Sequence, residues 1–209
     1  MRPSSPRSRF FGLFSVLSRV IPAAYFSIAC YGFWGNFLRT GRWTSLFWMG
    51  SEGIVVLLLV LRRESTSVSR SPWDWAVGIA GFFFVLLVRP ASRGIVPDAV
   101  GVALQLAGTL FESYGKAALG RSFGIVAANR GIVVKGPYRF VRHPIYLGYL
   151  VTHIGFLLSN WSVRNLAIYA IAYFFQVARI FSEERILAED DSYRAYRERV
   201  RFRLIPGIF

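Results

Sequence analysis

The sequence has little cysteine and little histidine. Its 209 residues include one cysteine, Cys30, and two histidines, His143 and His153. A single cysteine excludes a disulfide, a cysteine-based zinc site and an iron–sulfur cluster within one chain. Two histidines are too few for a histidine-rich metal site, so we expect no metal.

Acidic residues are also scarce, whereas apolar residues are abundant. The chain holds 11 acidic and 25 basic residues, is 54% hydrophobic and 17% aromatic, and has a mean hydropathy of +0.42. This is too apolar for an ordinary soluble domain. The net charge of +14 does not indicate nucleic acid, because the cations lie between apolar runs, where they orient helices and meet anionic headgroups. We expect an all-α, polytopic integral membrane protein whose partner is the lipid bilayer.

Long apolar runs support this fold class. A helix that crosses about 30 Å of hydrocarbon needs about 20 apolar residues. Runs of this kind occur at 20–38, 43–61, 73–89 and 95–114, and two shorter runs at 144–159 and 164–182 predict a tilted helical hairpin. We therefore predict about five to six transmembrane helices.

The composition changes at residue 115. Residues 115–142 are rich in glycine and cations, which is typical of a loop, and 183–203 form a charged segment near the C-terminus. We divide the chain into N-terminal transmembrane helices, 1–114, and a catalytic region, 115–209, within one integrated membrane domain. Because alternate connections are richer in arginine and lysine, we predict that both termini and the 115–142 loop are cytoplasmic.

The segment after this loop predicts a helix that begins in a polar cluster. Proline makes the preceding His143 extended, while Pro144 suits the first turn of a helix. The free N–H groups there suit a carboxylate or phosphate. Tyr146 and Tyr149 share a side by their three-residue spacing, and Gly148 leaves room for a ligand or another backbone.

A pair of glutamates follows at the end of the last long apolar run. Glu183 and Glu184 are costly there unless a cation meets them. Arg179 and Arg185 are structural candidates for that role. The predicted topology also places the pair on the side of His143. Adjacent helical residues point about 100° apart, so we expect one glutamate to meet a ligand and the other to meet Arg142 or another arginine.

A purely structural interpretation of these residues stays open at this point. In it, Arg139 and Arg142 anchor the chain at the membrane surface, the tyrosines form an interfacial belt and His143 caps a helix. Glu112 lies within an apolar run, where a buried acid needs a partner or serves a pathway. His153 is interpreted as a packed or interfacial histidine.

The motifs "GPYRFVRHPIYLGYL", "EERIL", "YRAY" and "RLIPGIF" occur in this order between residues 136 and 209. This combination resembles the isoprenylcysteine carboxyl methyltransferase family and, more loosely, the membrane phospholipid methyltransferases. The resemblance covers residues 115–209. It implies an integral membrane enzyme that transfers a methyl group from S-adenosylmethionine to a lipophilic small-molecule or lipidated acceptor.

The resemblance also implies roles for residues at the matching positions. Arg142, His143 and Glu184 are the implied catalytic residues. The implied cofactor-binding residues are Tyr138, His143, Pro144, Tyr146, Leu147, Gly148, Glu183, Glu184 and Tyr196. Tyr193 and Arg203 help to close the pocket. Asp190 and Asp191 stand near a position where family members often have glycine.

The sequence leaves the acceptor open. A prenylcysteine carboxylate, a phospholipid amine, a small isoprenoid and a hydrophobic thiol or acid are all compatible with the resemblance. Two other functions stay as alternatives: a membrane reductase that acts on a sterol-like lipid with a nicotinamide cofactor, and a non-enzymatic protein that binds lipid headgroups.

Overall fold

The computed structural model describes residues 6–41, 44–65, 67–69, 71–91 and 94–209, and most of them are helical, which confirms the predicted all-α class. The chain forms two compact units, Met1–Arg62 and Arg63–Phe209. The functional division at residue 115 stays a prediction.

The first unit is a pair of helices. Helix α1 (Pro6–Thr40) continues through Pro22, and α2 (Thr44–Leu61) packs against it. Helix α2 is a nearly unbroken apolar run, and Val55 and Leu59 are almost fully buried.

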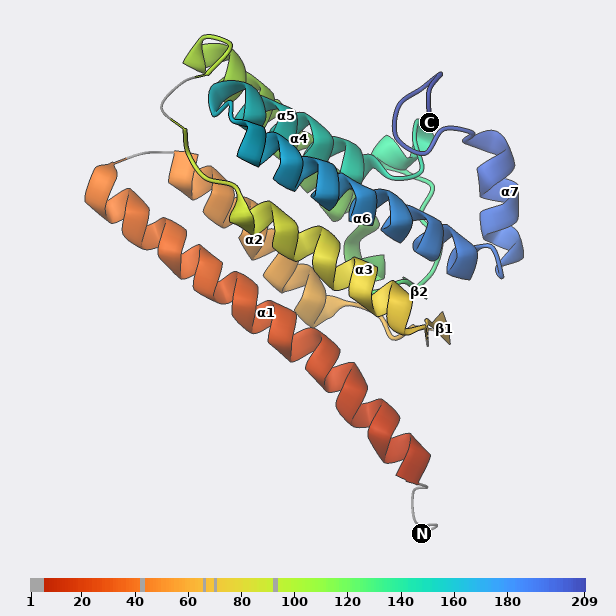
Figure 1. The fold of residues 1–209 in the computed structure, drawn as a ribbon. Coiled ribbons are helices and arrows are strands. Elements are labelled where there is room, and N and C mark those ends of the chain that lie inside the picture. Colours follow the sequence, from red (N-terminus) through yellow and green to blue (C-terminus); the bar gives the residue numbers. More distant parts are fainter. Residues whose placement is uncertain (1–5, 42–43, 66, 70, 92–93) are drawn as a thin grey trace. The chain divides into compact units, whose positions relative to one another are not determined.

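The second unit is built from two further pairs of helices, which Figure 1 shows in yellow to blue. Helix α4 packs mainly on α5, and α3 packs mainly on α6, whereas α5 and α6 have much less contact with each other. The helices are α3 (Pro72–Phe83), extended by the 3-10 turn η1 (Phe84–Leu87), α4 (Asp98–Leu119), α5 (Pro144–Ser159), α6 (Val163–Leu187) and α7 (Asp191–Arg199).

Glycines allow α4 and α5 to approach closely. A Cβ atom added at Gly148 would lie 2.6 Å from the backbone nitrogen of Glu112, and one at Gly108 would lie 2.5 Å from that of Thr152. Neither position tolerates a side chain without a shift of the helices. Small residues at such a contact are typical of helices packed within membranes.

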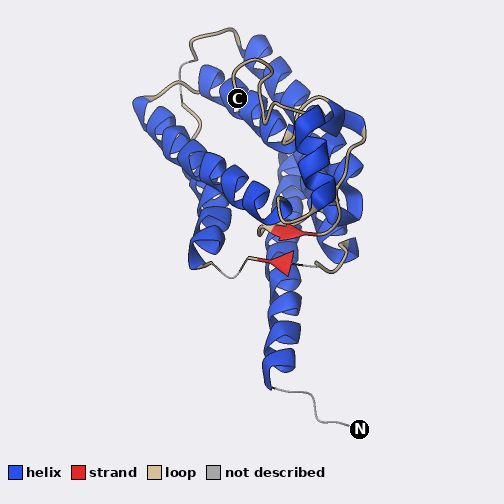
Figure 2. Ribbon diagram, turned by 90° about the vertical axis from the view of Figure 1, so that its right-hand side faces the viewer, coloured by secondary structure: helices blue, strands red, loops and turns tan. Residues whose placement is uncertain are grey.

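The connection between α4 and α5 contains short elements. It includes η2 (Gly120–Ser122), β2 (Ala128–Asn129) and η3 (Gly136–Arg139). Strand β2 pairs antiparallel with β1 (Ser67–Val68), which precedes α3 (Figure 2). The predicted loop start at residue 115 is wrong by five residues: α4 continues to Leu119 and ends at Gly120, whose φ of 54° suits glycine.

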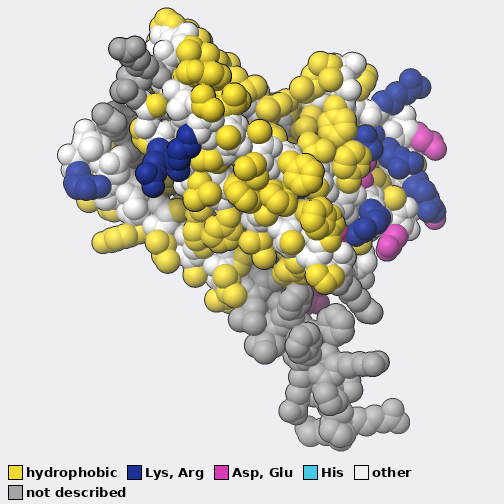
Figure 3. Space-filling view, in the orientation of Figure 1, with side chains coloured by type: hydrophobic (Ala, Val, Ile, Leu, Met, Phe, Trp, Pro, Cys, Tyr) yellow, Lys and Arg dark blue, Asp and Glu magenta, His cyan; other side chains and the backbone are white. Residues whose placement is uncertain are grey.

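Among the described residues, α6 alone combines the length and the apolar composition needed to cross a bilayer. Shorter apolar helical stretches cover 46–61, 72–87 and 144–159. The predicted count of five to six spans therefore stays a prediction. On the face shown in Figure 3, hydrophobic side chains cover much of the surface. Lys and Arg side chains gather at two sides of this face, and Asp and Glu side chains are seen mainly at one of them, the side where α7 lies.

Candidate functional site

The two helix pairs of the second unit meet at the predicted polar residues. Helix α5 begins at Pro144, as predicted, and His143 precedes it with φ −125° and ψ 62°. Helix α6 extends beyond the apolar run 164–182 and carries Glu183 and Glu184 before it ends at Leu187. Imidazole from the α4/α5 pair therefore faces carboxylates from the α3/α6 pair.

Glu184 is the buried centre of this cluster. Arg142 Nε donates to Glu184 Oε1 at 2.7 Å, and Arg203 Nε donates to Oε2 at 3.0 Å. The Nε2 atom of His143 lies 3.2 Å from Oε1. The prediction that one glutamate pairs with Arg142 is confirmed for Glu184, and its two oxygens are both engaged.

Glu183 faces a different set of partners and is more open. The Tyr146 hydroxyl donates to Glu183 Oε1 at 2.5 Å, and Arg179 Nε donates to the same oxygen at 3.1 Å. The Nδ1 atom of His143 lies 3.8 Å from Glu183 Oε2. The side chain of Glu183 is 19% exposed, against 7% for Glu184. His143 thus lies between the two carboxylates, and Glu183 is the one that a ligand reaches more easily.

The Arg142 guanidinium also holds the C-terminal segment in place. Its Nη1 atom donates to the carbonyl oxygens of Val200, at 3.0 Å, and Arg201, at 2.8 Å. The backbone nitrogen of Arg142 donates to the carbonyl of Phe202 at 3.0 Å. Because this arginine is 6% exposed and its side chain donates to three partners, it fixes the site rather than offering an open cation.

Two tyrosines of α7 close the cluster on another side. The Tyr196 hydroxyl donates to the carbonyl oxygen of Tyr138 at 2.8 Å, and Tyr193 packs against Tyr196 and Val200. Burial raises the pKa of Tyr138, Tyr193 and Tyr196 above the ordinary value of a tyrosine. For Tyr193, the nearby Glu184 carboxylate raises the pKa further. The phenols therefore stay neutral.

Asp190 has a clear structural role in the turn before α7. It is the N-cap of α7 and accepts from the backbone nitrogen of Ser192 at 2.9 Å. Its other oxygen accepts from the Asn129 side chain at 2.9 Å. The Ser192 hydroxyl also donates to Asp190, and this hydrogen bond, followed by those from Asn129 and the Ser192 backbone, lowers the pKa of Asp190. The turn into α7 is thus built by a capping aspartate.

The remaining predicted cofactor residues divide between two faces of α5. Leu147 packs against a cluster that includes Tyr146 and Ile180 of α6. Pro144 is almost fully buried at the first position of the helix. Gly148 instead lies against Glu112 of α4, so its missing side chain admits a neighbouring backbone.

Two supporting residues are not identified by the sequence analysis, Asp74 and Lys116, and both are buried and paired. Arg179, a structural candidate from the sequence, does pair with Glu183. Lys116 Nζ lies 3.0 Å from Glu112 Oε1, so the acid within the apolar run has its partner one turn away. The four-residue spacing is a usable signal for that pair, although the glycine-rich composition of 115–142 predicts a loop there.

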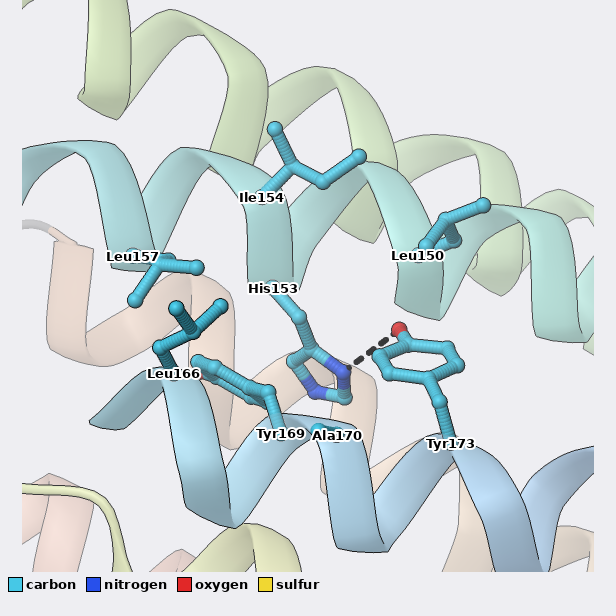
Figure 4. A pocket seen from close by; sticks show the side chains of 8 residues that line it. All are labelled: Leu150, His153, Ile154, Leu157, Leu166, Tyr169, Ala170 and Tyr173. Atoms are coloured by element: carbon cyan, nitrogen blue, oxygen red, sulfur yellow. Dashed lines mark hydrogen bonds between the residues drawn. The ribbon is translucent and has the colours of Figure 1, made fainter. Parts of the chain in front are cut away.

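An apolar groove lies between α5 and α6 (Figure 4). Its volume is about 230 Å³. The lining residues are Leu150, His153, Ile154, Leu157, Leu166, Tyr169, Ala170 and Tyr173. One polar contact lies within it, between His153 Nδ1 and the Tyr173 hydroxyl at 2.8 Å.

Stacked and edge-on aromatic rings link this groove to the glutamates. His153 stacks on Tyr169 and Tyr149, with ring centroids 5.0 and 6.2 Å apart. Tyr149 meets Tyr146 edge-on at 6.3 Å, and Tyr146 donates to Glu183. His153 is therefore a packed histidine, as interpreted from the sequence.

Comparison with known proteins gives a family match for the region that carries this site. Residues 95–194 match the family model described as phospholipid methyltransferase. This range contains α4, α5 and α6 and therefore both halves of the cluster. The resemblance to membrane methyltransferases that the motifs predicted is confirmed for this region.

One similar protein has a more specific name than the family model. The chain is 35% identical over 102 residues to the Protein-S-isoprenylcysteine O-methyltransferase of Schizosaccharomyces pombe (strain 972 / ATCC 24843). The match covers 44% of this chain and 43% of that protein, so the chain matches less than half of the relative's length. A solved structure of the eukaryotic intramembrane Ras methyltransferase ICMT aligns with 94% of this chain and 97% of its own, with a TM-score of 0.48 and 15% identity.

Proposed function

We propose that this protein is an integral membrane methyltransferase that uses S-adenosylmethionine and methylates a lipophilic acceptor, with an isoprenylcysteine-type carboxylate as the leading candidate. The observation that carries this proposal is the placement of His143 between Glu183 and Glu184. This cluster lies in the region that matches the methyltransferase family model and is flanked by an apolar groove.

The chemistry of the cluster fits the proposed cofactor. S-adenosylmethionine carries an ammonium group, a carboxylate, ribose hydroxyls and a sulfonium. Glu183 is a partly open acceptor for the ammonium or a hydroxyl. Arg203, whose side chain is 28% exposed, and the N-terminus of α5 suit the carboxylate. Tyrosine rings suit a sulfonium, as they do other cations.

When bound, the cofactor supplies an electrophilic methyl group, and the protein's part is mainly alignment. Transfer to a carboxylate forms a C–O bond and breaks the S–C bond, and no proton leaves the acceptor. Glu184, fixed by three donors, and Arg142, which holds the C-terminal segment, keep the site rigid. Such a site gains rate by orientation and by exclusion of water.

An amine acceptor is the second candidate, and the description of the matching family supports it. A protonated amine must lose its proton before it attacks the methyl group. His143 is placed for that task because a carboxylate lies near each of its ring nitrogens. The product distinguishes the two cases, since a methyl ester is cleaved by mild base and a methylamine is not.

The proposed location is the bilayer, with the termini and the 115–142 segment on the cytoplasmic side. The apolar composition of α6 and the exposed large hydrophobic residues support a membrane environment. Exposed aromatic and aliphatic side chains of this kind, such as Phe174 and Ile79, are costly in water and favourable in lipid.

Binding of S-adenosylmethionine to the detergent-purified protein, measured by calorimetry, tests the proposal. We expect saturable one-to-one binding by the wild type. Glu184→Gln should lose affinity by about 100-fold or more, because Arg142 and Arg203 lose their counter-charge. Glu198→Gln, which alters an exposed glutamate of α7, should leave the affinity unchanged. Absence of binding to a folded wild type would refute the proposed cofactor.

Radiolabelled methyl transfer then identifies the acceptor class. A prenylated cysteine with a free carboxylate and a phosphatidylethanolamine vesicle are offered separately. We expect base-labile label on the prenylated cysteine. Base-stable label on the phospholipid would overturn the carboxylate and favour the amine.

A further inference from the structure

The candidate site depends on how two helix pairs are held together. His143 and Tyr146 belong to the α4/α5 pair, whereas Glu183 and Glu184 belong to the α3/α6 pair. Helix α6 has much less contact with α5 than with α3. The contacts between α3 and α6 therefore largely set the position of the glutamates.

A buried carboxylate at the start of α3 binds the last turns of α6. Asp74 Oδ1 accepts from the Ser182 hydroxyl at 2.7 Å, and Arg185 Nη2 donates to Oδ2. The hydroxyl of Ser69, which precedes the helix, donates to the same Oδ2. Asp74 is 1% exposed, so its charge is stabilised by these donors and not by water.

The two contacts on α6 directly flank the glutamates. Residues 182 and 185 are three apart and share one face of the helix. Each intervening residue turns by about 100°, so Glu183 and Glu184 project away from that face. Ser182 and Arg185, both bound to Asp74, therefore fix the rotation of this turn about its axis.

We propose that Asp74 is a positioning residue that fixes the rotation and height of the last turns of α6, so that Glu183 and Glu184 both reach His143. It does not touch the cluster itself. Its effect on cofactor affinity rests on the proposed function, whereas its effect on the contact between His143 and the glutamates does not.

A polar contact earlier in α6, about two turns before the glutamates, provides a control. Gln176 Nε2 donates to the carbonyl of Gly81 in α3 at 3.2 Å, also in a buried position. This contact joins the same two helices but lies before the turn that carries the glutamates. Its loss weakens the packing of α3 on α6 without releasing the face that Ser182 and Arg185 share.

Histidine NMR provides a readout that needs no cofactor. With two histidines in the chain, selective ¹³C labelling of the imidazoles gives two signals, and a His153→Gln variant assigns them. We expect Asp74→Asn and the milder Ser182→Ala to shift the His143 signal while the His153 signal stays. Gln176→Leu is expected to leave the His143 signal in place. An unchanged His143 signal in folded Asp74→Asn and Ser182→Ala would overturn the proposal.

Affinity for S-adenosylmethionine provides the second readout. We expect the Kd to rise about fivefold or more in Asp74→Asn and less in Ser182→Ala, because both residues act on the ligand only through other residues. At saturating donor the turnover number should change less than the KM for the donor.

Equal losses of affinity in Gln176→Leu and Asp74→Asn would point to general loosening and contradict a specific positioning role. If the wild type binds no S-adenosylmethionine, the proposed function fails, and the NMR result still decides the role of Asp74.

Discussion

At the scale of single residues, the polar cluster works as a set of fixed groups. Arg142 is the clearest case, because one side chain joins Glu184 to the carbonyls of Val200 and Arg201. The motif resemblance implies a catalytic role for this arginine. Its buried contacts favour a role in organising the carboxylates and the C-terminal segment around His143.

The Tyr196 hydroxyl offers a test at this scale. Tyr196→Phe leaves the buried carbonyl of Tyr138 without its donor, so we expect the free energy of unfolding to fall by about 1 to 2 kcal/mol. Thermal denaturation in detergent measures this loss. Tyr31→Phe, at an exposed position, is the matched control and should leave the midpoint unchanged.

The pH dependence of that loss has a definite sign. Burial raises the folded-state pKa of Tyr196 above its unfolded value of about 10. The contribution of the neutral phenol is therefore complete below about pH 10 and is lost as the pH rises through the folded-state pKa. The difference between wild type and Tyr196→Phe should be constant near neutral pH. A difference that vanishes at about pH 8 would contradict a buried, neutral phenol.

At the scale of elements, local rules predicted some boundaries and failed at others. The start of α5 was predictable because proline restricts the residue before it and suits the first helical turn. The end of α4 was missed because Gly115 and Lys116 have loop character, although Lys116 is paired with Glu112 within the helix. The contacts of Asp74 with Ser182 and Arg185 could not be predicted locally, because these partners lie 108 and 111 residues later in the chain.

The close packing of α4 on α5 gives a prediction for Gly148. In Gly148→Ala the new Cβ atom would lie 2.6 Å from the Glu112 backbone nitrogen. The two helices must then separate, and we expect the protein to lose about 1 to 3 kcal/mol of stability and to bind S-adenosylmethionine more weakly. Gly120→Ala is no control, because its positive φ strains any side chain. Gly53→Ala, whose Cβ atom would meet nothing within 4 Å, is the suitable one. Equal melting midpoints for Gly148→Ala and Gly53→Ala would contradict the packing argument.

At the scale of the whole molecule, an apolar surface and a polar cluster occur in one chain. The convergence of Arg142, His143 and the two glutamates was predictable from topology and from the motif resemblance. The aromatic series from His153 through Tyr149 to Tyr146 lies on α5 at spacings of four and three residues, which the helical period predicts. The stacking of His153 on Tyr169 of α6 was not predictable, because it depends on tertiary packing. This series connects the groove to the cluster, which suits a substrate with a lipid part and a reactive head.

The groove between α5 and α6 gives the last prediction. If the hydrocarbon part of the acceptor lies there, Ala170→Trp fills the space beside His153 and Tyr169. We expect the KM for a prenylated cysteine to rise about tenfold or more, because several buried methylene contacts are lost. The Kd for S-adenosylmethionine should stay within about twofold, because the cofactor residues lie at the other end of the aromatic series. Ala167→Trp places the same bulk on an exposed part of α6 outside the groove and should leave both constants unchanged. An equal effect of the two tryptophans, or a rise in the cofactor Kd alone, would assign the acceptor chain to another surface.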